Sequence, residues 1–169
     1  SNKADANKTY GHIRDWNVSA VTDMSEAFKD RPIFNEDISG WDLSNVTSMK
    51  AIFSGASSFN QPIGDWNVSS VTKMNIMFRK ATSFNQPIGD WNVSSVTDTG
   101  FMFQNAKAFN QPIGRWNTAQ ITTLHKTFAY NSGFNTDISA WNTAKVTNWH
   151  QMFNNANAFS GNCSLVAAL

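Results

Sequence analysis

The sequence predicts an α/β repeat solenoid of six 25-residue coils, each with a short parallel strand and a short helix. Three observations lead to this fold class: a fixed repeat, a strand-like alternation at its start and a helix-like spacing after it. The repeat is marked by tryptophans that recur every 25 residues without an insertion, namely Trp16, Trp41, Trp66, Trp91, Trp116 and Trp141. One coil alone cannot bury both of its faces, so neighbouring coils must stack around a shared core.

Composition sets limits on the class of protein. The 169 residues carry 13 Lys and Arg against 12 Asp and Glu, and this formal charge of +1 argues against a nucleic-acid partner. No apolar run approaches the length of about 18 residues that a membrane-spanning helix needs, so we expect no membrane insertion. A single cysteine, Cys163, excludes an internal disulfide framework.

The repeat also divides the chain. Residues 16–165 form six copies and are expected to be a single solenoid domain. Residues 1–15 are interpreted as an N-terminal partial repeat or cap, because Ile13 precedes Trp16 at the spacing that an isoleucine keeps in later copies. Residues 166–169 are an end or a truncated seventh repeat, and Cys163, at an isoleucine position, is expected to be a buried free thiol.

The start of each copy predicts the strand. In the pattern I-x-x-W-x-V, given by Ile63, Trp66 and Val68, the last two apolar residues alternate as a short strand requires. An outward row of tryptophans would form an aromatic ladder for sugars or bases. Because Trp66 shares its face with Val68, the pattern favours tryptophans in the core.

The middle of each copy predicts the helix. Val71, Met74, Phe78 and Ala81 are spaced by 3, 4 and 3 residues, which is typical of one face of a helix. A threonine before each such segment is a candidate helix N-cap: Thr22, Thr47, Thr72, Thr97, Thr122 and Thr147. The predicted structural core comprises the six tryptophans together with Phe53, Phe78, Phe103 and Phe128.

A bend closes each copy. A second phenylalanine is followed by asparagine in five of the six copies, and we expect these asparagines to form a ladder between neighbouring coils. Pro62, Pro87 and Pro112 then keep the chain extended.

The motifs resemble a known family. I-x-x-W-x-V resembles the L-x-x-L-x-L core of leucine-rich repeats, whose period range of 20–29 residues includes 25. The string F-N-Q-P-I-G-D-W-N-V-S-S-V-T-x-M, at residues 59–74 and again from Phe84, is similar to BspA-like leucine-rich-repeat surface proteins. The resemblance implies a leucine-rich-repeat-like fold and a role in adhesion or interaction at a cell surface. Trp and Phe in place of Leu leave a straighter stack, closer to a β-solenoid, as the alternative.

No catalytic motif is present in the repeat. We find no Ser-His-Asp set, phosphate-binding glycine loop or H-E-x-x-H helix, so we expect no enzyme and no cofactor. His125 and His150 share one repeat position but lack a third ligand, so we expect no metal site.

The outward strand positions are the candidate binding face. They flank each tryptophan and comprise Asp15, Asn17, Asp42, Asp65, Asn67, Asp90, Asn92, Arg115 and Asn117. We expect a non-enzymatic cell-surface or secreted module that presents this face to a protein or glycan. The alternative is a structural spacer with no ligand of its own. The two ends of the stack are expected to allow end-to-end self-association.

Overall fold

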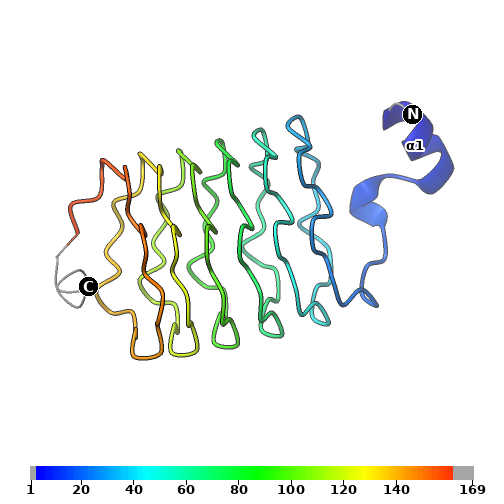
Figure 1. Cartoon of the computed structure of the whole chain (residues 1–169). Helices are drawn as coiled ribbons and strands as arrows, with labels where there is room; N and C mark the ends of the chain where they lie inside the picture. Colours follow the sequence, from blue (N-terminus) through cyan, green and yellow to red (C-terminus); the bar gives the residue numbers. More distant parts are fainter. Residues whose placement is uncertain (1–2, 162–169) are drawn as a thin grey trace.

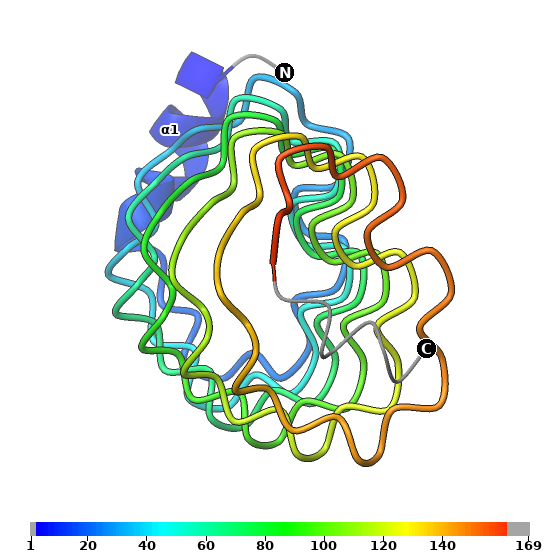
Figure 2. The ribbon, with the colours of Figure 1, turned by 90° about the vertical axis from the view of Figure 1, so that its left-hand side faces the viewer.

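The protein is a stack of 25-residue coils preceded by a short helical segment. A computed structural model describes residues 3–161. Helix α1 (Lys3–Tyr10) and the 3₁₀ helix η1 (Ile13–Asp15) lead into the stack, whose coils lie side by side between the two ends of the chain (Figure 1). Viewed along the stack, successive coils follow nearly the same outline (Figure 2). No helix among the described residues is long and apolar enough to span a membrane.

The predicted strand and helix of each coil are wrong. Within residues 16–161 the chain forms turns and extended segments, and pairing between coils is limited to isolated parallel bridges. These bridges join the residues that follow the repeated threonines: Asp23 to Ser48, Ser48 to Lys73, Lys73 to Asp98, Asp98 to Thr123 and Thr123 to Asn148. The α/β repeat solenoid and the β-solenoid alternative are therefore both corrected to a stack of turn-rich coils.

The segment predicted as helix is not a helix, because its backbone N–H groups donate hydrogen bonds to the next coil. The N–H groups of Met74, Ile76, Phe78 and Lys80 donate to carbonyl oxygens 24 residues ahead, at 2.8–3.1 Å. An α-helix would instead bond these groups to carbonyls four residues earlier. Between them, the N–H groups of Met77 and Arg79 donate three residues back, to Met74 and Ile76. The segment is thus a run of tight turns whose every second amide reaches a neighbouring coil.

Left-handed backbone conformations produce these turns. Ile76 and Lys80 have φ of 64° and 60°, and the equivalent residues of the other coils also have positive φ. Positive φ at the third residue of a hydrogen-bonded turn is the signature of type II. Two such turns in succession advance the chain by four residues each, so Met74 and Phe78 reach the same side without a helix. The spacing in the sequence is therefore the same as on a helical face.

The segment predicted as strand is not a strand, because its backbone groups bond within the same coil. Trp66 N–H donates to Ile63 O at 3.2 Å and Val71 N–H to Val68 O at 2.9 Å, so this side of the coil consists of local turns. Here the coils are joined by side chains: each indole N–H donates to an isoleucine carbonyl of the preceding coil at 3.0–3.2 Å. The pairs are Trp41 with Ile13, Trp66 with Ile38, Trp91 with Ile63, Trp116 with Ile88 and Trp141 with Ile113.

Stacked aromatic rings fill the core. Phe78 lies 3.9 Å from Phe84 in its own coil, and 5.7 and 5.6 Å from Phe53 and Phe103 in the neighbouring coils, measured between ring centroids. Twelve of the 13 phenylalanines belong to the two columns built in this way. The tryptophans at 41, 66, 91, 116 and 141 are only 3–7% exposed. Trp16 departs from the expected burial at 43%, because no coil lies before it.

Two polar ladders run along the stack. The threonines predicted as helix N-caps do not cap helices. From Thr47 onward, each hydroxyl donates to the carbonyl of the threonine one coil earlier, as Thr72 does to Thr47 at 3.2 Å. The expected asparagine ladder is confirmed. Each asparagine side-chain oxygen accepts a hydrogen bond from the backbone N–H group 25 residues later, at 2.8–3.0 Å. The accepting residues are Asn35, Asn60, Asn85, Asn110 and Asn135.

The expectations for the two ends concern residues 1–15 and 166–169. The expected partial repeat at residues 1–15 contains α1 and η1, although the Tyr10 and Ile13 carbonyls still accept the indole N–H groups of Trp16 and Trp41. The predictions for Cys163 and for residues 166–169 lie outside the described residues.

Candidate functional site

The residues predicted as a binding face are all exposed. This holds for both sets that flank the tryptophans, comprising Asp15, Asn17, Asp42, Asp65, Asn67, Asp90, Asn92, Arg115 and Asn117. Because the coils are in register, each set forms a row along the stack. The two rows differ in how firmly their side chains are held.

The row that follows the tryptophans is occupied by turn formation. Asn67 Oδ1 accepts both the Ser69 N–H at 3.2 Å and the Ser69 hydroxyl at 2.7 Å. Asp42 Oδ1 accepts the Ser44 N–H at 3.0 Å, and hydrogen bonds from the backbone and side chain of Ser44 lower the pKa of Asp42. Side chains used in this way stabilise the turn, which reduces their freedom to contact a ligand.

The row that precedes the tryptophans carries the free charges. Asp65, Asp90 and Arg115 lie on three consecutive coils, are exposed, and form no hydrogen bond or ion pair with any described residue. Asp90 and Arg115 line a surface hollow of about 520 Å³ together with Pro87, Pro112 and Asp137. This row and its hollow form the candidate binding site, which we call the Asp–Arg row.

Glycines hold the floor of this hollow close to the next coil. A Cβ atom built on Gly89 would collide with the carbonyl oxygen of Pro112, and one built on Gly114 would lie 2.5 Å from that of Asp137, a distance that real side chains do not reach. Close approach of this kind is a general reason for glycine in a backbone. The backbone beneath the Asp–Arg row is therefore tightly packed.

A second hollow, of about 560 Å³, lies on the turn side of the first three coils. It is polar and is lined by Asp23, Ser25, Glu26, Thr47, Ser48, Lys50, Thr72 and Lys73. Hydrogen bonds from the side chain and backbone of Ser25 lower the pKa of Asp23, with a smaller contribution from Lys73. The sequence does not indicate this hollow, because the apolar spacing of this segment predicts a helix, and side chains on a helix would point away from one another.

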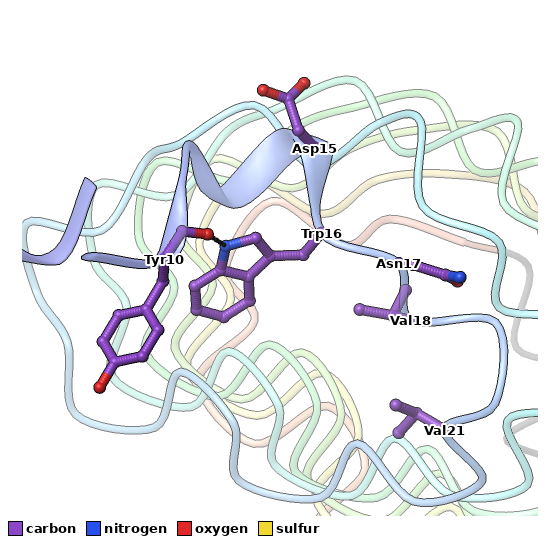
Figure 3. A pocket seen from close by; sticks show the side chains of 6 residues that line it. All are labelled: Tyr10, Asp15, Trp16, Asn17, Val18 and Val21. Atoms are coloured by element: carbon purple, nitrogen blue, oxygen red, sulfur yellow. Dashed lines mark hydrogen bonds between the residues drawn. The ribbon is translucent and has the colours of Figure 1, made fainter. Parts of the chain in front are cut away.

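A third hollow opens at the N-terminal end of the stack. It measures about 700 Å³ and is lined by Tyr10, Asp15, Trp16, Asn17, Val18 and Val21. Figure 3 shows the Trp16 ring, Val18 and Val21 facing the hollow, whereas Asp15 and Asn17 point away from it. The apolar wall is the part of the first coil that a preceding coil would cover.

The repeated histidines form a stack. The rings of His125 and His150 are 5.4 Å apart and nearly parallel, and Phe101 meets His125 edge-on at 4.7 Å. Burial lowers the pKa of His125, and the neighbouring charges of Lys126 and His150 act in the same direction. Among residues 3–161 no group of three or more His, Cys, Asp or Glu side chains could hold a metal ion.

Comparison with known proteins identifies the family. The family model described as "Mycoplasma protein of unknown function, DUF285" matches residues 2–108 and 87–167. The chain belongs to this family. The two matched ranges of the DUF285 chain overlap, as expected for an array of similar units. No curated protein and no solved structure matches the chain.

Proposed function

We propose that this DUF285 chain is a non-enzymatic interaction module, secreted or held at a cell surface, that presents the Asp–Arg row to a protein or glycan. The location rests on the similarity of its F-N-Q-P-I-G-D-W-N-V repeat to BspA-like surface proteins. The mode of binding rests on the contrast between polar side chains that are hydrogen-bonded within the stack and charged side chains that are not.

The observation that carries the proposal is the contrast between bonded and free polar groups. The repeated Trp, Thr and Asn side chains are bonded between coils, and most residues after the tryptophans are bonded within turns. Asp65, Asp90 and Arg115 take part in neither set. A rigid stack thus holds three free charges at one repeat position, and such preorganisation lowers the entropy lost on binding.

The charges favour a partner with a matching pattern. Two carboxylates on adjacent coils suit a basic protein segment, and the neighbouring guanidinium of Arg115 can bind a carboxylate of a protein or an acidic sugar. The hollow beside Asp90 and Arg115 adds proline rings as apolar contact surface. Both partner classes use the same row, so one set of variants tests them.

A glycan array and a pull-down with extracellular proteins test this proposal. The variant combines Asp65→Asn and Asp90→Asn, which removes the carboxylates with little change in shape. The control combines Asp23→Asn and Asp98→Asn, because the amide oxygen still accepts the hydrogen bonds from residues 25 and 100. Binding that survives the control but not the first pair supports the proposal. Binding that is insensitive to both pairs contradicts it.

A structural spacer is the second candidate. The unbroken side-chain ladders favour it, because a stack with bonds between all neighbouring coils can keep two attached parts a fixed distance apart without binding any ligand. Failure to bind any glycan or extracellular protein in the same screen would favour the spacer over the interaction module.

A further inference from the structure

We propose that the two ends of the stack dock head to tail, with the sixth coil of one copy covering the first coil of a second copy. The first coil is residues 16–40, and the sixth begins at Trp141 and is described to residue 161. This inference concerns the ends of the stack and is independent of the Asp–Arg row.

The direction of the backbone bonds makes the ends complementary. Along the turn side, amides of each coil donate to carbonyls of the following coil, as Phe28 does to Ile52 and Phe128 to Met152. The first coil therefore has four carbonyls that no coil uses, at Asp23, Ser25, Ala27 and Lys29. The sixth has four amides that find no acceptor among the described residues, at Trp149, Gln151, Phe153 and Asn155. Four donors at one end match four acceptors at the other in spacing.

The aromatic columns end at the same faces. Phe28 and Phe34 in the first coil, and Phe153 and Phe159 in the sixth, are only partly buried, whereas their counterparts in the inner coils are fully buried. Docking in register would place Phe153 of one copy over Phe28 of the next, continuing the 5.6–5.7 Å spacing of that column. It would also cover the apolar hollow around Trp16. Removing this apolar surface from water favours association.

The charges of the ends also match. The first coil has five carboxylates against two cationic side chains, a formal charge of −3, whereas residues 141–161 contain Lys145 and His150 but no carboxylate. Docking two first coils would oppose acidic groups and bring carbonyls against carbonyls. The contact is therefore between unlike ends of the chain.

A contact between unlike ends does not close on itself. Each added copy presents a new free end, so the product is an open linear series rather than a dimer. Sedimentation velocity of the full chain from micromolar to millimolar concentration should show masses that increase through successive multiples of 18.8 kDa.

A charge reversal tests the register of the contact. Gln151 and Glu26 occupy the same repeat position and are both exposed. In the docked pair they face one another, so Gln151→Glu opposes two carboxylates and should raise the dissociation constant about tenfold. Adding Glu26→Lys in the same chain should restore association. The melting temperature of each variant serves as the check on folding.

Three outcomes would overturn the proposal. A single species of monomer mass up to millimolar concentration would exclude association. A mass that stops at twice the monomer would indicate a closed contact between like ends. Association that is unchanged by Gln151→Glu in a folded variant would place the contact elsewhere on the molecule.

Discussion

Phe78 shows how strongly one side chain is tied into the stack. It is fully buried and its ring stacks on Phe53, Phe84 and Phe103. Phe78→Ala should lower the free energy of unfolding by about 3–5 kcal/mol, since it removes a large core side chain. Chemical denaturation measures this. Phe101→Ala is the matched control because Phe101 is partly exposed and lies outside the columns, and equal losses for the two variants would contradict the assigned core.

His125 links stability to pH. Its Nδ1 is buried without a hydrogen-bond partner, and burial lowers its pKa below the ordinary value. A base with a lowered pKa in the folded state is protonated preferentially when unfolded, so its contribution is present above about pH 6.5 and is lost as the pH falls below it. The carboxylates with lowered pKa values, such as Asp42, titrate at more acidic pH.

The expected result is a melting temperature that falls between about pH 8 and pH 5. His125→Gln should reduce this fall, since glutamine does not titrate, whereas His12→Gln serves as a control at the other end of the chain. An identical fall in the wild type and in His125→Gln would contradict the assignment.

At the scale of the element, the sequence is sufficient to predict which side chains face inward but not the backbone that places them. Trp66 and Val68 share a face, and both are buried, whatever conformation lies between them. The spacing of Met74 and Phe78 fits a helix and a pair of four-residue turns equally well. Ile76 and Lys80, which adopt positive φ, are not residue types that favour it. Comparison of the copies does carry a signal, because the position of Lys80 is occupied by Asp30, Gly55, Asn105 and Asn155 in other coils, and these types favour positive φ.

Lys80 tests these turns directly. Its φ of 60° suits glycine, disfavours a β-branched residue and is unavailable to an α-helix. Lys80→Val should be less stable than Lys80→Gly by about 1–2 kcal/mol. The same pair at Lys107, where φ is not positive, should show the opposite order because glycine weakens an ordinary backbone position. Thermal unfolding measures the stability of the four variants. A valine variant more stable than the glycine variant at both sites would contradict the turn geometry.

The asparagine ladder is the second element that a variant can test. Asn85 Oδ1 accepts from the Asn110 N–H and from Gln111 Nε2 in the next coil. Asn85→Ala should cost about 1 kcal/mol of stability because the partners lose their acceptor. Asn85→Asp keeps the oxygen and should remain closer to the wild type in chemical denaturation. Equal losses in Asn85→Ala and Asn85→Asp would show that the side-chain oxygen contributes nothing.

At the scale of the whole molecule, the repeat length is the most informative feature of the sequence. It predicts that Asp65, Asp90 and Arg115 lie in one row, because residues 25 apart occupy equivalent places in successive coils. It does not separate them from the asparagines after each tryptophan, because turn bonding such as that of Asn67 to Ser69 depends on backbone geometry. The polar hollow between Asp23 and Lys73 escapes prediction because it exists only when the turns are stacked in register.

The central claim is that the coils are held together by backbone bonds from turn to turn, without a strand or a helix in each coil. Scalar couplings across hydrogen bonds, measured by long-range HNCO spectroscopy on labelled protein, identify the acceptor of each amide. We predict a correlation from the Phe78 amide nitrogen to the Met102 carbonyl carbon, with matching pairs such as Ile76 to Gly100. A correlation from Phe78 to the Met74 carbonyl, four residues earlier in the same coil, would indicate a helix and contradict the claim.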